Sequence, residues 1–224
     1  TINFAKKISN ALLKCHIDVR KKMFKPVLDA LGGNMRFIIS GGAPLDKNVA
    51  KGFNDLGIEL VQGYGLTETS PVVAVGTNKE YKTGSIGKAI PGVEVKLANT
   101  DKDGMGELLV KGPNVALCYY NDEQATKEAF EGEWFHTGDL AKIDDEGYIF
   151  ICGRKKSVIV LKNGKNIFPE EMENLVNKIE GIKESFIFGK IQSNDENNIK
   201  INVKIVFDRD VIKDVYKEIR SSEK

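Results

Sequence analysis

The sequence has no excess of charge of either sign and no long apolar run. Lysine and arginine together number 33 against 32 aspartates and glutamates, so the formal net charge is only +1. Nucleic-acid binding usually requires a basic excess and is therefore not expected, and no run of like charge forms an interaction tail. No apolar run approaches the length of about 18 residues that a membrane-spanning helix needs, and the first residues do not resemble a signal peptide.

Cysteine is scarce as well. Cys15, Cys118 and Cys152 are far apart, and no C-x-x-C pair occurs. A disulfide framework and a structural zinc site are therefore not expected, and a reducing, cytoplasmic setting is favoured. With 224 residues the chain is long enough for one large domain with a sizeable core. Because it begins at Thr1 inside a helical pattern, we expect a piece of a longer protein.

Helical and strand patterns alternate in the first part of the chain. Apolar residues recur every three or four positions over residues 3–22 and 27–31, which predicts two helices. Short apolar runs at 36–40 and 58–62 predict strands, and the helix expected between them has Pro44 near its first turn. A strand, a helix and a strand within about 25 residues predict a βαβ unit with parallel strands. Ligands of such sheets bind at the carboxyl ends of the strands.

The pattern changes after residue 83. Residues 84–153 contain short alternating runs separated by turn residues, which predict an antiparallel barrel or meander with one helical interruption at 123–130. Pro169 then opens a strong helix whose glutamates favour its positive end, and its apolar face is expected to continue to Ile179. Further elements are expected after this helix: strands at 185–188 and 199–207, and a helix at 211–220. We therefore expect an α/β piece, a β-rich subdomain and a small α+β unit.

The densest set of candidate binding residues follows the second predicted strand. Gly63 and Gly65 bracket Tyr64 and can take backbone angles that other residues avoid, so a ligand could approach the backbone closely. Tyr64 offers a flat face for stacking, Thr67 can bond a phosphate oxygen, and Glu68 is a hard oxygen ligand suited to Mg²⁺. This combination favours ATP, and a Gly-rich surface turn is the alternative. A dinucleotide fingerprint is disfavoured, because Glu68 replaces its third glycine.

Five motifs in order carry a resemblance to a known family. They are SGGAPL at 40–45, QGYGLTE at 62–68, WFHTGD at 134–139, GRKK at 153–156 and GKNIFPEE at 164–171. Together they closely resemble the adenylate-forming superfamily of acyl-CoA synthetases, beetle luciferases and peptide-synthetase adenylation domains. Within it the chain is most similar to bacterial long-chain fatty acid–CoA ligases. The implied fold is a truncated acyl-CoA synthetase: residues 1–154 would end its large domain (1–83 the α/β piece, 84–153 the barrel-like subdomain), and 155–224 would begin its small mobile domain.

The resemblance implies a nucleotide site built largely from residues with small side chains. The pocket would be lined by Gly41, Gly42, Ala43, Pro44, Gly63, Tyr64 and Gly65. Tyr64 would stack on adenine, Thr67 would bond the α-phosphate oxygens, and Glu68 would hold Mg²⁺.

Later motifs imply further roles. Asp139 would accept both ribose hydroxyls, and Arg154 would reach the ribose and phosphates as a catalytic group; the alternatives are a turn aspartate and a surface arginine lying over the barrel. Lys156, two residues after the arginine, would be the hinge about which the small domain rotates. Gly164 would line the CoA channel. We expect His136 to be structural or pocket-lining, because the chemistry needs no protein nucleophile.

The implied reaction joins a carboxylic acid to CoA in two steps, with ATP, Mg²⁺ and CoA as cofactor and substrates. A long-chain fatty acid is the first expectation. Another carboxylic acid, aryl or shorter in chain, and a non-catalytic nucleotide-binding module with the same fold are the alternatives. A fatty-acid substrate leaves peripheral membrane association open, although no strongly basic amphipathic helix occurs. The phosphate loop and the C-terminal lysine typical of the superfamily do not occur in the sequence, so we expect these 224 residues alone to be inactive.

Overall fold

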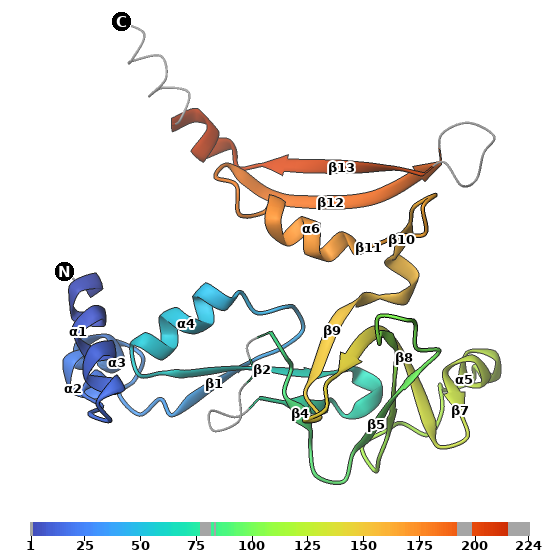
Figure 1. Cartoon of the computed structure of the whole chain (residues 1–224), viewed down its shortest axis with the longest axis horizontal. Coiled ribbons are helices and arrows are strands. Elements are labelled where there is room, and N and C mark those ends of the chain that lie inside the picture. The colour runs from blue at the N-terminus through green and yellow to red at the C-terminus, as the bar shows by residue number, and fades with distance from the viewer. Residues whose placement is uncertain (1, 77–81, 83, 192–198, 215–224) are drawn as a thin grey trace, which may run out of the picture. The chain divides into compact units, whose positions relative to one another are not determined.

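The computed structural model describes residues 2–76, 82, 84–191 and 199–214 (Figure 1). Their packing divides the chain into two compact units. Unit 1 comprises the described residues within Thr1–Thr137 and Ala141–Ile151, and unit 2 those within Gly138–Leu140 and Cys152–Lys224.

Two sheets and five helices lie in the described part of unit 1, except that residues 138–140 of β8 and 152–154 of β9 belong to unit 2. The helices are α1 (Ile2–Lys14), α2 (Arg20–Met23), α3 (Lys25–Ala30), α4 (Lys47–Asp55) and α5 (Glu123–Ala129). The first sheet has the order β1-β2-β3-β4, formed by β1 (Phe37–Ser40), β2 (Glu59–Gly65), β3 (Val72–Val75) and β4 (Lys88–Ala89). The second has the order β5-β6-β8-β7, with β9 paired to β8, formed by β5 (Glu94–Ala98), β6 (Gly106–Lys111), β7 (Phe130–Glu131), β8 (Trp134–Ile143) and β9 (Ile149–Arg154).

The βαβ unit at the start of the first sheet matches the prediction. Strands β1 and β2 are parallel, from the pair Phe37↔Glu59 to the pair Ser40↔Gln62, and α4 packs against β2 (Figure 1). Helix α4 begins later than Pro44. The carboxylate of Asp46 accepts hydrogen bonds from the main-chain N–H groups of Asn48 and Val49 and so fixes the first turn. Both strands therefore end at the same edge of the sheet.

Strand β2 is longer than the predicted run 58–62. It continues through Gly65 and pairs antiparallel with β3, in the register Gly63↔Val75 and Tyr64↔Ala74. The core of unit 1 lies where β3 meets the second sheet, and its buried members are Val73, Ala74, Ile86, Leu108, Val110, Ala141 and Ile149. The two sheets are thus held by one shared apolar cluster.

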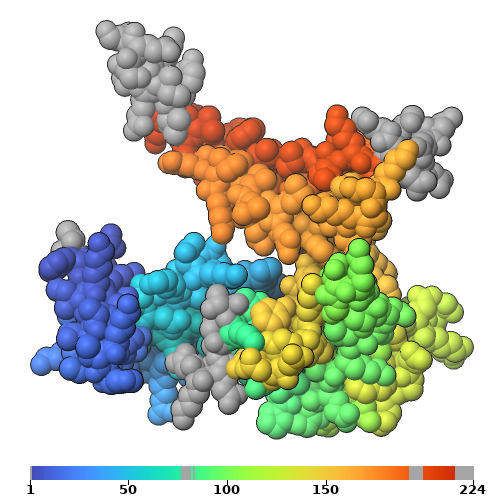
Figure 2. Space-filling view, in the orientation of Figure 1, coloured from blue at the N-terminus to red at the C-terminus, as the bar shows by residue number. Residues whose placement is uncertain are grey.

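The N-terminal helical segment differs from its prediction. Helix α1 ends at Lys14, and a turn with His16 in the left-handed region separates it from α2, so residues 3–22 are not one helix. Within α1 the buried residue is Ser9, whereas Phe4 is exposed. Helix α1 packs against α4, and there the Asn10 amide donates to the Asp55 carboxylate over 2.9 Å. Figure 2 shows the surface of α1 adjoining that of α4.

The second sheet confirms the predicted antiparallel pattern at its first hairpin. Strands β5 and β6 are antiparallel from Glu94↔Lys111 to Ala98↔Glu107, and β7 and β8 are antiparallel at Phe130↔Phe135. Strand β4, which lies within the predicted β-rich range, instead pairs with β3 of the first sheet. The boundary between the two sheets therefore falls after residue 89.

The described part of unit 2 contains two hairpins, the helix α6 of about two turns and a second helical stretch at 209–214. Its elements are the 3-10 turn η3 (Lys155–Ser157), β10 (Ile159–Val160), β11 (Asn166–Ile167), α6 (Pro169–Val176), β12 (Ile182–Ile191) and β13 (Ile199–Phe207). Helix α6 lies along one face of the β12–β13 hairpin, where the Glu173 carboxylate accepts a hydrogen bond of 2.7 Å from the Ile187 N–H (Figure 1).

The helical predictions in unit 2 are met in part. Helix α6 ends at Val176, before Ile179, which is exposed, so the predicted apolar face is shorter than expected. The chain is helical again at 209–214, and residues 215–220 of the predicted last helix lie outside the described residues.

Candidate active site

The first two glycine-rich segments meet at the carboxyl edge of β1 and β2. A methyl group added at Gly41, just after β1, would lie 3.4 Å from the Gly63 carbonyl oxygen, so the two backbones are in close contact there. Gly42 has a φ of +82°, which only glycine adopts readily, and nothing lies within 4 Å of the position of its absent methyl group. Alongside, the side-chain carbonyl of Gln62 accepts a hydrogen bond of 3.4 Å from the Leu45 N–H.

Gly63 and Gly65 do not take the unusual backbone angles that were predicted, and close approach of a ligand to them stays a prediction. Neither has a positive φ, because both belong to strand β2. A methyl group on Gly65 would instead lie 1.6 Å from the Pro71 carbonyl oxygen, and one on Gly63 would lie 2.9 Å from the Ile39 side chain. The absent side chains thus allow close packing within the chain itself.

Tyr64 lies between these glycines on β2. Its side chain is half-buried and packs against the core cluster of unit 1. The strand fixes its position, and its stacking on adenine stays a prediction.

A tight turn places Thr67 and Glu68. Residues Thr67–Thr69 form the 3-10 turn η1, which Thr69 stabilises: its buried hydroxyl accepts from the Leu66 N–H over 3.0 Å and donates to the Pro71 carbonyl over 2.7 Å. Thr67 is exposed and Glu68 is half-buried. The turn therefore holds a hydroxyl and a carboxylate two and three residues beyond the end of β2.

The Glu68 carboxylate has a partner that the sequence did not reveal. The Tyr119 hydroxyl donates to Glu68 Oε1 over 2.8 Å, and the Glu68 carbonyl accepts from the Ala116 N–H over 2.8 Å. Burial, and then the hydrogen bond to Glu68, raise the pKa of Tyr119 above its usual value. No local signal marks Tyr119, which lies 51 positions after its partner.

Asp139 and Arg154 form an ion pair in unit 2. The Arg154 Nε lies 3.0 Å from Asp139 Oδ1, and the Asp139 side chain is 7% exposed while that of Arg154 is 55% exposed. Gly138, with a φ of +71°, gives β8 an irregular backbone just before the aspartate. The pairing brings together one residue each from the third and fourth sequence motifs, WFHTGD and GRKK, and a ribose or phosphate role for either stays a prediction.

The third motif, WFHTGD, also contains His136, which lies between two carboxylates in unit 1. Its Nδ1 is 3.3 Å from Glu107 Oε2 and its Nε2 is 3.4 Å from Glu131 Oε2. Glu107 is buried on β6. These contacts link β6, β7 and β8, which fits the structural role expected for this histidine.

Lys156, the expected hinge, and Gly164, expected to line the CoA channel, both lie in turns of unit 2. Lys156 is exposed within η3, between β9 and β10. Gly164 has a φ of +78° in the turn between β10 and β11, where its N–H donates to the Leu161 carbonyl over 2.8 Å. Their roles as a hinge and as part of a CoA channel stay predictions.

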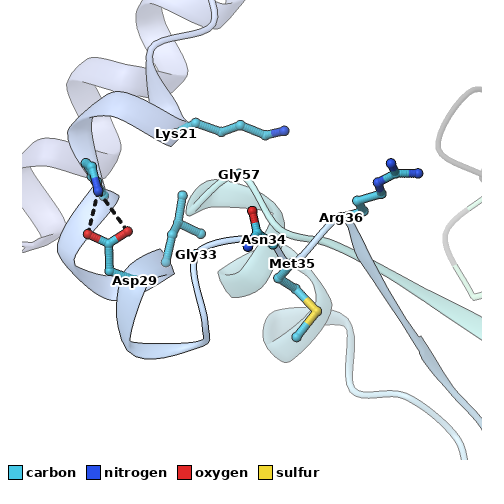
Figure 3. A pocket seen from close by; sticks show the side chains of 9 residues that line it. Lys21, Asp29, Gly33, Asn34, Met35, Arg36 and Gly57 are labelled. Carbon is cyan, nitrogen blue, oxygen red and sulfur yellow. Dashed lines mark hydrogen bonds and ion pairs between the residues drawn. The ribbon is translucent and has the colours of Figure 1, made fainter.

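A pocket of about 370 Å³ lies elsewhere in unit 1. Its lining comes from α2, α3, the turn after α3 and Gly57, and Lys21 and Arg36 project beside it while Lys25 is paired with Asp29 (Figure 3). Because Arg36 precedes β1, this pocket is at the amino end of the strand, opposite the edge that holds the predicted site residues. None of the predicted site residues lines it.

Comparisons with known proteins identify the family. A family model described as AMP-binding enzyme matches residues 2–120, more than half of the chain. The chain belongs to the AMP-binding enzyme family. The long-chain-fatty-acid–CoA ligase FadD15 of Mycobacterium bovis is 38% identical over 78% of this chain and 28% of its own length. The 2-succinylbenzoate–CoA ligase of Listeria innocua is 34% identical over 89% of this chain and 43% of its own length.

Solved structures of AMP-binding enzymes have the same fold. The O-succinylbenzoate Coenzyme A synthetase of Bacillus subtilis, in complex with ATP and magnesium ion, superposes with a TM-score of 0.70 at 27% identity, over 84% of this chain and 40% of its own. This confirms the predicted mixed α/β, truncated acyl-CoA synthetase-like fold. The chain spans less than half the length of these relatives. In the part of the chain that the structure describes, no helix combines the length and the hydropathy needed to cross a bilayer.

Proposed function

We propose that the natural polypeptide carrying this chain activates a carboxylic acid with ATP and transfers the acyl group to CoA. The observation that supports this most strongly is the placement of Thr67 and Glu68 just beyond the carboxyl end of β2. Thr67 supplies a hydroxyl, and Glu68 supplies a carboxylate that accepts a hydrogen bond from Tyr119. Ligands of α/β sheets bind at that edge. The named activities of the two curated relatives, both CoA ligases, support the same reaction class.

The residues of the chain fit Mg²⁺ as the ion accompanying the nucleotide. Among the described residues no group of three or more histidine, cysteine, aspartate or glutamate side chains could hold a metal by itself. Mg²⁺ does not need such a group, because it is commonly held by one or two carboxylates together with substrate phosphates and waters. Glu68 would supply the carboxylate. When bound, the ion would neutralise developing negative charge on the phosphates.

The chain's side chains would act by positioning and by polar contacts. In the first step a carboxylate oxygen of the acid forms a bond to the α-phosphorus of ATP, and the bond to pyrophosphate breaks. In the second step the CoA thiol, losing its proton, forms a bond to the acyl carbon, and AMP leaves. Thr67 would donate to an α-phosphate oxygen, Tyr64 would support the adenine, and Asp139 would accept from the ribose hydroxyls with Arg154 holding its carboxylate. No protein nucleophile is required, so orientation and charge stabilisation would supply the rate enhancement.

For the acid, a long-chain fatty acid is the first candidate, because the FadD15 relative, 38% identical to this chain, carries that name. An aryl acid is the second. It is favoured by the succinylbenzoate ligase, which matches 89% of this chain, and by the TM-score of 0.70 with the corresponding B. subtilis structure.

Acid-dependent exchange of labelled pyrophosphate into ATP tests the proposal. The natural polypeptide that carries this chain is incubated with palmitate, 2-succinylbenzoate or acetate, and CoA thioester is followed in parallel. We expect exchange and thioester with palmitate, and Glu68→Gln should reduce the exchange by at least tenfold because a metal-binding carboxylate is lost. Glu180→Gln, at an exposed position of unit 2, is the control. Preference for 2-succinylbenzoate would select the second candidate, and exchange with no acid would refute the ligase assignment.

A further inference from the structure

The loop that joins β6 to α5, residues 112–122, is attached to the Thr67–Thr69 turn at three places. The Asn114 side-chain amide donates to the Thr69 and Val72 carbonyls over 2.9 and 2.8 Å. The Ala116 N–H donates to the Glu68 carbonyl, and the Tyr119 hydroxyl donates to the Glu68 carboxylate, each over 2.8 Å. We call residues 112–122 the brace loop.

Two of the attachments fix the main chain and one fixes a functional group. The Asn114 and Ala116 contacts hold the backbone of the turn in place. The Tyr119 contact determines where one carboxylate oxygen of Glu68 points. Among the described residues no other side chain is hydrogen-bonded to that carboxylate. The brace loop therefore controls the orientation of Glu68 separately from the position of its backbone.

Tyr119 is itself held on both sides. Its N–H donates over 3.0 Å to the hydroxyl of Thr126, which lies within α5. Its ring packs edge-on against Phe130 at a centroid distance of 6.1 Å, and Phe130 packs on the buried ring of Phe135 at 5.1 Å. The phenol thus reaches Glu68 from a rigid support in the second sheet, and its ring would stay packed if the hydroxyl were removed.

We infer that Tyr119 is a positioning residue for the metal-binding carboxylate. By occupying Oε1 of Glu68, its hydroxyl would restrict the side chain to one orientation and leave Oε2 to face the cation that accompanies the nucleotide. A hydrogen bond to an ionised carboxylate is among the stronger ones in proteins, so it can hold this orientation. The inference rests on the proposed function, since it assigns Glu68 to the metal.

The alternative role for the Tyr119 hydroxyl is purely structural support of the turn. The two roles differ in what they do to nucleotide binding with and without a metal. If the hydroxyl orients Glu68, its loss weakens binding of the metal–nucleotide complex but not of the metal-free nucleotide. If the hydroxyl only supports the turn, its loss weakens nucleotide binding both with and without the metal.

The adjacent tyrosine provides a matched control. Tyr120 is 91% exposed and has no described contact, so Tyr119→Phe and Tyr120→Phe each remove one hydroxyl at neighbouring positions. Both variants are made in the natural polypeptide that carries this chain. Binding is measured by electron paramagnetic resonance with Mn²⁺ and ATP, and by calorimetry with ATP in the presence of EDTA. The Mg²⁺ concentration for half-maximal pyrophosphate exchange is recorded as well.

For Tyr119→Phe we expect the dissociation constant of Mn²⁺–ATP and the half-maximal Mg²⁺ concentration to rise about three- to tenfold, because the glutamate side chain regains part of its rotamer freedom and must be ordered again when the metal binds. Binding of ATP in EDTA should change less than twofold, and Tyr120→Phe should match the wild type throughout. Equal values for the two variants, or an equal loss with and without metal, would overturn the inference. A wild type without exchange and without Mn²⁺–ATP binding would instead overturn the proposed function and this inference with it.

Discussion

Gly65 gives the clearest way to test the packing at the end of β2. An alanine there would place its methyl carbon 1.6 Å from the Pro71 carbonyl oxygen, 2.6 Å from the Pro71 carbonyl carbon and 3.0 Å from the Val72 Cα. The first distance is about half of the 3.4 Å at which ordinary contact begins. All three atoms belong to the backbone, so no side chain can rotate away to make room.

The expected loss of stability follows from this geometry. Overpacking a core usually destabilises a protein by about 1–3 kcal/mol when side chains can adjust. At Gly65 the β2–β3 pairing itself must shift, so we expect Gly65→Ala to cost at least about 3 kcal/mol. For a protein of this size each kcal/mol corresponds to about 2–4 °C in melting temperature, which gives a decrease of about 6–12 °C.

Circular dichroism melting curves and hydrogen–deuterium exchange of the β2–β3 segment measure the effect. Gly52→Ala is the control with the opposite sign: Gly52 lies inside α4, and nothing is within 4 Å of its missing methyl group. Alanine there should stabilise the helix by about 0.5–1 kcal/mol. If Gly65→Ala melted within 2 °C of the wild type and kept the amide protection of β2, the packing described for this strand would be wrong.

Three further predictions concern the site and the pH dependence of folding. Asp139→Ala should raise the Michaelis constant for ATP in pyrophosphate exchange by at least tenfold, because charge-assisted hydrogen bonds of about 1.5–3 kcal/mol would be lost; the exposed Asp145→Ala is its control, and equal constants for the two would remove Asp139 from the site. Lys156→Pro should leave acyl-AMP formation largely intact and abolish thioester formation, because proline fixes φ at a position proposed to need two backbone states; an equal loss in both steps would argue against a hinge. The hydrogen bond from Arg20 lowers the pKa of Asp18 to about 2, so its stabilising contribution is present above about pH 4 and is lost as the pH falls through 2. Because this side chain is 46% exposed, Asp18→Asn should cost less than about 1 kcal/mol at pH 7 and flatten the acid limb of a stability–pH curve; an unchanged acid limb would contradict the pairing.

Local sequence patterns correctly predicted the elements that depend mainly on neighbouring residues. The parallel β1–β2 pair followed from two short apolar runs with a helix between them, and the β5–β6 hairpin from alternation around a turn. Helix boundaries were less predictable. The period of α1 continues past Lys14 in the sequence, but a left-handed turn at His16 follows the helix, and α1 packs against α4, which lies more than 30 residues further along the chain.

The candidate site was predictable only as far as motifs reach. Thr67, Glu68 and their turn could be located because they stand together in the sequence. The hydrogen bonds of Asn114 and Tyr119 to that turn join residues 42 to 51 positions apart, and neither residue type is unusual in a loop. The sequence also could not show why position 65 is a glycine. Unusual backbone angles and close packing both favour glycine, and only the position of the Pro71 carbonyl in the fold shows that close packing applies.

The hydrogen bond between Glu68 and Tyr119 also has a consequence for biosynthesis. Its two residues are 51 positions apart, so at 5–20 residues per second a ribosome adds the tyrosine about 3–10 s after the glutamate. During that interval the turn after β2 can form, but its carboxylate has no partner from the second sheet. A nascent chain halted before residue 112 would carry the glycine-rich motifs and the glutamate without the support that orients it. With Glu68 as the proposed metal ligand, competence for metal–nucleotide binding would appear only after the brace loop has emerged and joined the turn.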